Sequence, residues 1–205
     1  MDRFFITIQI IKNTIMKELK TIRITNIADL KVGMFDLGNG MFTTEKPPRT
    51  IVRSVVAAII PEEKRALGLC PSYKMLPWCY TAIGAITQQF AYGKEACKYI
   101  KQYIADKDVT LPALDFCLNY SNIKVAAEEA FLPSQTELRL IYLSENKWRG
   151  PLEKLDIRIF DNTLLSSSIN SSYFVWVQGL KNVISRADYQ CRAYGVCPVV
   201  EINLS

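Results

Sequence analysis

The sequence predicts an α+β protein in which an antiparallel sheet is covered by helices within a single domain, residues 1–205. Three observations predict this class: strand-like alternation near both ends, helical spacing in the middle, and short connections between the segments. The length sits at the upper end for one domain, with two small lobes as the alternative. We expect N-terminal strands in residues 1–46, a helical section in 47–108, and a strand-rich section with one helix in 109–205.

The first section reads as strands. Residues 3–11 place Phe4, Ile6, Ile8 and Ile10 on one side, and residues 20–25 alternate in the same way. A signal peptide is the competing interpretation of this apolar start, but no small-residue cleavage site follows it. Residues 31–35 form a weaker strand candidate. The glycine-rich stretch 36–40 is then a strong turn signal.

The middle section favours helices. Residues 51–60 repeat apolar side chains at helical spacing, although their β-branched residues fit a buried strand equally well. Pro61 ends this segment and opens a short charged helix. Residues 76–92 are almost wholly apolar and predict a central core helix. Residues 94–107 are amphipathic, with Cys97, Ile100, Tyr103 and Ile104 facing inward.

The last section returns to strands. Four strands are expected, at residues 137–143, 152–160, 189–193 and 198–204. A hairpin loop over 144–151 joins the first two. Apolar residues from 173 to 184 fall on one helical face, which predicts the one helix of this section.

The sequence shows no organised catalytic apparatus. It contains no histidine, which removes the usual general base near neutral pH and a common metal ligand. Ser121 to Lys124 matches S-x-x-K but lacks its companion elements. The adjacent pairs at 62–63 and 128–129 point their carboxylates apart. We therefore expect no enzymatic activity, no metal and no cofactor, and an enzyme with serine, lysine or carboxylate chemistry is the remote alternative.

Six cysteines are present, and none forms a C-x-x-C pair. They lie at positions 70, 79, 97, 117, 191 and 197. Most have apolar neighbours, which favours buried free thiols in a reducing compartment, while the even count leaves disulfides open.

Two kinds of surface are candidates for contacts. Lys94, Lys98 and Lys101 would form a basic stripe suited to phosphates or anionic lipid, with a solvated helix face as the alternative. Residues 1–53 carry nine cations against five acids, including Lys12, Lys17 and Lys20, which favours an acidic or phosphate-bearing partner.

Two apolar spots add to these. Trp148 lies between Lys147 and Arg149 in the expected loop, a pattern suited to a lipid interface, or else it folds back over the sheet. The stretch Leu111, Pro112, Ala113 and Leu114 is either core or an exposed loop for self-association.

Several short motifs resemble the matrix proteins of rhabdoviruses over residues 49–204. The motifs are Arg49-Thr50, Val55 to Ala58, Leu67 to Leu69, Ser72 to Leu76, Leu111 to Leu114, and Arg149 to Glu153. In that family the position of 111–114 carries an exposed hydrophobic loop. The sequence departs from the family because it lacks the basic, proline-rich arm and its P-P-x-Y budding motif.

The resemblance implies a non-enzymatic structural protein of an RNA virus that self-associates and bridges the nucleocapsid, a ribonucleoprotein, and an anionic membrane surface during assembly and budding. It would be found in the virion, in the host cytoplasm and at the inner face of membranes. The cations and Trp148 named above would contact membrane and nucleocapsid, and 111–114 would mediate self-association. The alternative is an intracellular interaction or effector domain that binds a host protein.

Overall fold

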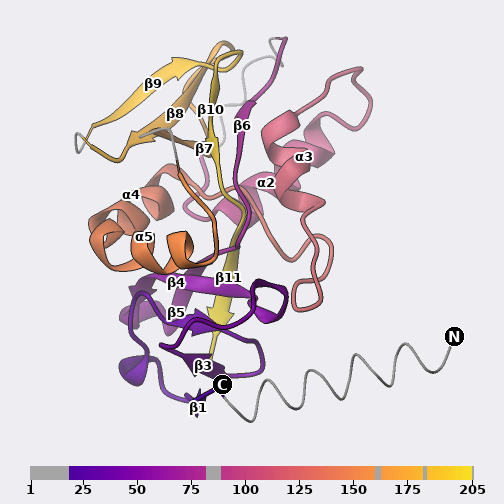
Figure 1. Cartoon of the computed structure of the whole chain (residues 1–205). Helices are drawn as coiled ribbons and strands as arrows, with labels where there is room; N and C mark the ends of the chain where they lie inside the picture. The colour runs from indigo at the N-terminus through magenta and orange to yellow at the C-terminus, as the bar shows by residue number, and fades with distance from the viewer. Residues whose placement is uncertain (1–18, 82–88, 160–162, 182–183, 205) are drawn as a thin grey trace, which may run out of the picture.

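The structure, a computed structural model, describes residues 19–81, 89–159, 163–181 and 184–204. It confirms an α+β fold with helices packed against antiparallel strands in a single domain, although two sheets are present where one was expected. Figure 1 shows the smaller sheet above and the larger sheet below, with the helices beside and between them. The predicted strand at 3–11 lies outside the described residues.

The larger sheet, which we call sheet A, has six strands in the order β1-β3-β2-β4-β5-β11. Its strands are β1 (Ile22–Arg23), β2 (Phe35–Asp36), β3 (Met41–Thr43), β4 (Ser54–Ile60), β5 (Arg65–Leu69) and β11 (Val199–Asn203). All neighbouring pairs are antiparallel. The strand predicted at 20–25 and the turn predicted at 36–40 are both present, and β2 begins at the end of the predicted strand 31–35.

The smaller sheet, sheet B, has the order β6-β10-β7-β8-β9. Its strands are β6 (Lys74–Pro77), β7 (Thr163–Ile169), β8 (Phe174–Gly179), β9 (Ser185–Tyr189) and β10 (Ala193–Val196). The β10–β7 pair is parallel and the other pairs are antiparallel. The described residues also form four α-helices: α2 (Gly93–Tyr103), α3 (Pro112–Leu118), α4 (Gln135–Leu143) and α5 (Glu145–Lys154).

In the middle section, the predicted helix at 51–60 is wrong and the alternative strand is right. β4 occupies Ser54–Ile60 and is buried almost throughout, because its β-branched side chains pack on both faces of the sheet. A short 3-10 helix at Pro61–Glu63 follows, as the proline predicts. The amphipathic helix predicted at 94–107 is confirmed as α2. The core helix predicted at 76–92 is wrong where it can be checked, since 74–77 is a strand and 78–81 and 89–92 are not helical.

In the last section, the predicted strand at 137–143 is wrong because α4 covers these residues. Ser134 and Glu137 form a reciprocal capping box, which fixes the start of a helix. The expected loop at 144–151 is helix α5. The expected strand at 152–160 begins inside α5, and no strand is described over residues 155–159.

The helix predicted at 173–184 is also wrong. Phe174, Val175, Trp176 and Val177 alternate in burial along β8, as a half-buried strand requires, and β9 follows. The strand at 189–193 is displaced, since β9 ends at Tyr189 and β10 begins at Ala193, while the strand at 198–204 is confirmed as β11. The expected helical section 47–108 is therefore wrong, because it holds β4, β5 and β6 beside α2. The section 109–205 does mix strands and helices, but its described residues hold three α-helices where one was expected.

The main core lies between the sheets and the helices. Trp78 and Trp148 are its largest fully buried side chains, and a second apolar cluster sits on the other side of sheet A. All six cysteines lie among the described residues as free thiols, five buried and Cys191 exposed, which confirms the prediction of buried thiols for five of them. Within the described ranges, no helix has the length and apolar character needed to cross a membrane.

Candidate binding cavity at the edge of the six-stranded sheet

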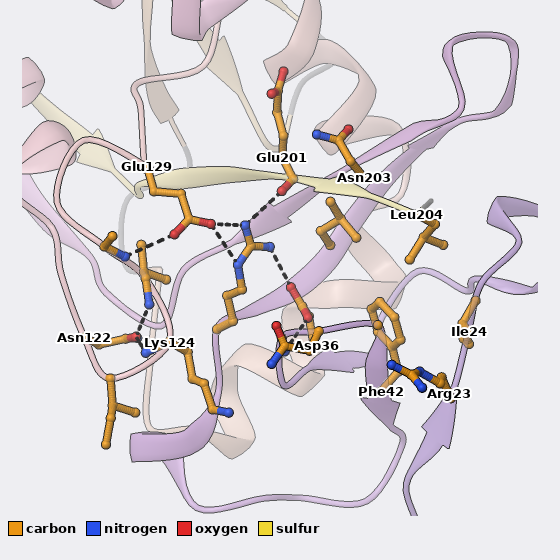
Figure 2. Close-up of a pocket in the computed structure, with 18 of the residues that line it drawn as sticks. Arg23, Ile24, Asp36, Phe42, Asn122, Lys124, Glu129, Glu201, Asn203 and Leu204 are labelled. Carbon is orange, nitrogen blue, oxygen red and sulfur yellow. Dashed lines mark hydrogen bonds and ion pairs between the residues drawn. The ribbon is translucent and has the colours of Figure 1, made fainter.

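A cavity of about 980 Å³ opens beside sheet A, between its two outermost strands. Its walls come from β1, from the turn that joins β2 to β3, from the loop 122–129, and from β11 (Figure 2). The lining residues with charged or amide side chains are Arg23, Asp36, Asn39, Arg53, Asn122, Lys124, Glu129, Glu201 and Asn203. A concave site of this volume is in the usual range for ligand binding.

The apolar floor of the cavity brings the two edges of the sheet together. Ile24, just after β1, and Ile202, on β11, belong to one apolar cluster with Phe42 on β3. Because β1 and β11 are the first and last strands in the order of the sheet, their shared cluster means that the sheet curls toward closure. The cavity is the gap that remains between its edges.

The edge of β11 presents main-chain groups to this gap. Val199 exchanges two backbone hydrogen bonds with Phe131, at 2.9 and 3.0 Å, on the side away from β5. In an antiparallel strand every second residue points its N–H and C=O the same way, so Glu201 and Asn203 also point away from β5. Among the described residues, neither the two N–H groups nor the Asn203 carbonyl has a backbone partner.

Arg53 fills the inner end of the gap. Its guanidinium donates to Asp36 Oδ2 at 2.9 Å, to the Glu201 carbonyl oxygen at 3.0 Å, and through Nε to Glu129 Oε1 at 3.1 Å (Figure 2). Asp36 also accepts from Ser54 Oγ at 3.0 Å and from the Gly38 amide at 2.8 Å. Arg53 therefore ties β2, β11 and the loop 122–129 together.

Contacts with Arg53 and with a backbone amide hold the Glu129 carboxylate in its charged form. Burial opposes ionisation of Glu129, but hydrogen bonds from Arg53 and from the Ala126 amide outweigh it and lower the pKa of the carboxyl. Burial likewise opposes the charge on Arg53, and the attraction of Asp36 and Glu129 outweighs it and raises the pKa of the guanidinium. Glu129 and Arg53 therefore both favour their charged forms and pair with each other.

The Glu201 side chain is engaged elsewhere. Its carboxylate lies 3.5 Å from Arg65 Nη1 and 3.6 Å from Lys94 Nζ. Arg65 in turn pairs with Glu137 at 3.1 Å and with Glu63, and its guanidinium stands 4.4 Å from the centre of the Tyr92 ring. Glu201 therefore joins two arginine networks, by its carbonyl oxygen to Arg53 and by its carboxylate to Arg65.

Two cations at the rim remain uncompensated. Arg23 is exposed and Lys124 is half-buried, and neither has an ion-pair partner among the residues that the structure describes. Figure 2 shows them on opposite sides of the cavity. A ligand entering here would meet positive charge from both walls.

Four of the described cysteines are buried in surroundings that disfavour the thiolate. Burial raises the pKa of the Cys97 and Cys197 thiols to about 12, and it raises the pKa of Cys70 and Cys117 as well. Ser121 and Lys124 share a loop, and the structure shows no hydrogen bond between their side chains. Among the described residues, no group of three cysteine or acidic side chains is placed to hold a metal ion.

The structure corrects the predicted membrane contact at Trp148. This side chain is 0% exposed and its indole Nε1 donates to the Ile141 carbonyl at 2.7 Å, so the alternative of a buried tryptophan is right. Lys147 beside it is exposed, and Arg149 is half-buried and pairs with Glu145 one helical turn away. The error came from reading a helix as a loop.

The predicted self-association loop is also wrong, and the alternative of core is right. Leu111, Ala113 and Leu114 are 0% exposed, and Pro112 opens helix α3. An exposed apolar loop for contact between copies is therefore absent at these positions.

The basic stripe is present as predicted on the outer face of α2. Lys94, Lys98 and Lys101 are all exposed, but Lys94 pairs with Glu201 and Lys101 pairs with Asp115 at 2.9 Å. Lys20 is exposed as well. Lys12 and Lys17 lie outside the described residues.

Sequence reasoning missed the centre of the cavity. Arg53, Glu129 and Glu201 are separated by more than 70 positions each, so no local spacing joins them. Asp36 was noted only as the start of a turn, and Arg53 only as one of the nine N-terminal cations. The S-x-x-K motif did mark Lys124, although for a different chemistry.

Comparison with known proteins supports the fold. No family model matches the sequence, and no curated protein matches it. A solved structure of a fimbrial protein from Bacteroides ovatus ATCC 8483 matches with a TM-score of 0.61 and 11% sequence identity. The match covers 83% of this chain and 48% of that one, so the chain spans about half the length of its structural neighbour. The chain therefore shares its fold with part of a fimbrial protein.

Proposed function

We propose that this chain is a non-enzymatic binding domain and that the cavity between β1 and β11 holds its partner. The observation that carries this proposal is the convergence of both sheet edges on one polar cavity. Main-chain groups of β11 and two rim cations face this cavity without partners among the described residues. Unsatisfied groups that converge in a concave site are the usual mark of a binding surface.

The chemistry of the cavity supports binding over catalysis. A general acid or base works best with a pKa near the working pH, whereas the pKa of Glu129 is pushed away from neutrality by Arg53. The buried thiols, with raised pKa values, would be poor nucleophiles. A fold shared with part of a fimbrial protein is compatible with a role in binding or assembly.

The experiment is a selection of binders from a displayed library of random heptapeptides on the full chain. We expect clones that bind the wild-type chain and lose binding to Lys124→Glu, because this change reverses the charge of one cavity wall. Lys181→Glu, an exposed residue beyond sheet B, is the matched control and should keep the same clones. Clones that bind both variants as well as the wild type, or no clones at all, would contradict the proposal.

The viral matrix role stays a prediction of the sequence resemblance. Its remaining support is the exposed face of α2, on which Lys98 has no ion-pair partner among the described residues. The measurement is binding to vesicles that contain phosphatidylserine, at low and at high salt. Binding that falls as salt is added would support this role, and binding that ignores salt would remove its electrostatic basis.

A further inference from the structure

We infer that the cavity takes an extended, acidic peptide segment of a partner protein, which adds to β11 as one further strand. This inference rests on the proposed function and names the class of its partner. Strand addition to an open sheet edge uses main-chain hydrogen bonds for affinity and side-chain pockets for selectivity. Each of these elements is present in the cavity.

The main-chain groups come from β11. The N–H groups of Glu201 and Asn203 and the carbonyl of Asn203 point into the gap, in line with the bridge that Phe131 makes to Val199. An added strand would lie beside β11 next to Phe131, which pairs with Val199, and would pair with the residues that follow Val199. The edge from Glu201 to Leu204 is about 13 Å long at 3.3 Å per residue, which matches a strand of about four residues.

The Glu201 carbonyl shows that this edge already accepts a donor from outside the sheet. Arg53 Nη2 donates to it at 3.0 Å, in the place where the N–H of a neighbouring strand would lie. This carbonyl is therefore already satisfied, and the added strand would pair with the Glu201 N–H and with the N–H and carbonyl of Asn203. Arg53 also closes the inner end of the gap, which fixes how deep the peptide can reach.

The apolar floor and the charged rim select the side chains. Successive side chains of a strand point to opposite faces, so every second residue would face Leu204 and the floor beneath it. The residues between them would face the rim, where Arg23 and Lys124 stand on opposite walls (Figure 2). Carboxylates at these positions would give Arg23 and Lys124 the ion-pair partners that the described residues do not supply.

A peptide fits this site better than a nucleic acid does. Nucleic-acid binding draws most of its affinity from many phosphate contacts. The cavity offers two uncompensated cations, and Arg53 is already neutralised by Asp36 and Glu129. The exposed main-chain groups of β11 have no role in a phosphate site of this kind.

The test uses two fluorescent heptapeptides that alternate valine with a polar residue, one with two central glutamates and one with two central lysines. Fluorescence anisotropy with the full chain gives their dissociation constants. We expect the acidic peptide to bind roughly tenfold more tightly than the basic one. Lys124→Glu should reverse this order, and Lys181→Glu should leave it unchanged.

A second variant tests the added strand itself. Asn203→Pro deletes an N–H that points into the cavity and leaves the β5 side of β11 intact. We expect it to weaken the acidic peptide at least tenfold while the circular dichroism spectrum is unchanged. If Asn203→Pro instead lowers the thermal midpoint, a different experiment tests the added strand. Hydrogen exchange of the Asn203 amide is then measured in the wild-type chain, with and without the acidic peptide.

Each outcome decides between the two proposals. Two results would overturn the inference that an acidic peptide adds to β11 as a strand. One is equal binding of both peptides, and the other is an Asn203 amide that exchanges as fast with the acidic peptide as without it. If library clones still depend on Lys124, the binding cavity itself stands. Binding of a ten-nucleotide poly-uridine in place of the peptides overturns the inference in favour of a phosphate site. If neither the peptides nor poly-uridine bind, and no library clone depends on Lys124, both the binding cavity and the added strand are contradicted.

Discussion

The ion-pair networks of Arg65 and Arg53 meet at Glu201, and their surroundings in the molecule differ. Arg65 pairs with Glu137, whose carboxylate also accepts the amides of Gly93 and Ser134 at 2.8 and 2.9 Å. That network joins sheet A to the first turns of α2 and α4. Arg53 instead pairs with Asp36 and Glu129 beside the cavity, and it also donates to the Glu201 carbonyl on β11.

The difference lies in what surrounds each arginine. The Glu137 side chain is 1% exposed and carries hydrogen bonds from two helix starts, so its network is part of the framework. Glu129 is 33% exposed and sits on a loop, so its network borders solvent. The same kind of ion pair can therefore hold a fold together in one place and line an open cavity in another.

The largest effect is expected where the framework is broken. Glu137→Ala should lower the free energy of unfolding by about 3–5 kcal/mol, because it leaves two buried amides unsatisfied and removes a carboxylate from Arg65. Urea denaturation followed by circular dichroism measures it. Glu95→Ala, an exposed acid on α2, is the control. A loss below about 1 kcal/mol would show that the network is not part of the framework.

A smaller loss is expected at the cavity. Arg53→Met should lower the free energy of unfolding by about 2–3 kcal/mol, because the nearly buried Asp36 loses its ion pair but keeps the hydrogen bonds from Ser54 and Gly38. The same denaturation experiment measures it, with Lys98→Met as control. A loss as large as that of Glu137→Ala would erase the distinction between the two networks.

The acid dependence of stability should separate the networks further. The lowered pKa of Glu129 means that its contribution is present above its unfolded pKa and is lost as pH falls through the folded value. Burial raises the pKa of Glu137 despite hydrogen bonds from Ser134, Gly93 and Arg65, so its contribution is present at low pH and is lost as pH rises through the folded value.

Comparison of two amide variants checks these signs. Between about pH 3 and 6, the stability difference between wild type and Glu129→Gln should grow with pH, and that between wild type and Glu137→Gln should shrink. Denaturation at several pH values gives both slopes. Slopes of the same sign would contradict the assignment of the two carboxylates.

The smallest effect is expected outside both networks. Lys98→Glu on the exposed face of α2 should change the free energy of unfolding by less than about 0.5 kcal/mol and leave peptide binding unchanged. Thermal denaturation and anisotropy measure the two quantities. A marked loss of peptide binding would move the binding surface from the cavity to the basic stripe.

The fold class could be predicted from the sequence, but several elements could not. The strands β1 and β11 lie within segments predicted as strands, and the amphipathic period predicted α2 because this helix has one buried and one wet face. The apolar residues of β4 satisfied a helical period by chance, since a strand buried on both faces loses its alternation. Those of β8 did so although this strand alternates in burial. The capping box of α4, Ser134 followed by Glu137, was visible in the sequence and would have corrected that helix.

The cavity could not be predicted, because it depends on how the sheet curls. Arg23, Lys124 and Asn203 meet only when β1 and β11, the first and last described strands, approach each other. Charge counting did point to residues 1–53 as a basic region. It could not show that Arg53 is neutralised there while Arg23 is not.

Hydrogen exchange along β11 in the free chain tests the central claim most directly. If the edge is open to the cavity, the amides of Glu201 and Asn203 should exchange much faster than those of Val200 and Ile202, which point toward β5. Equal protection of all four amides would mean that this edge is already covered, and the proposed site would not exist.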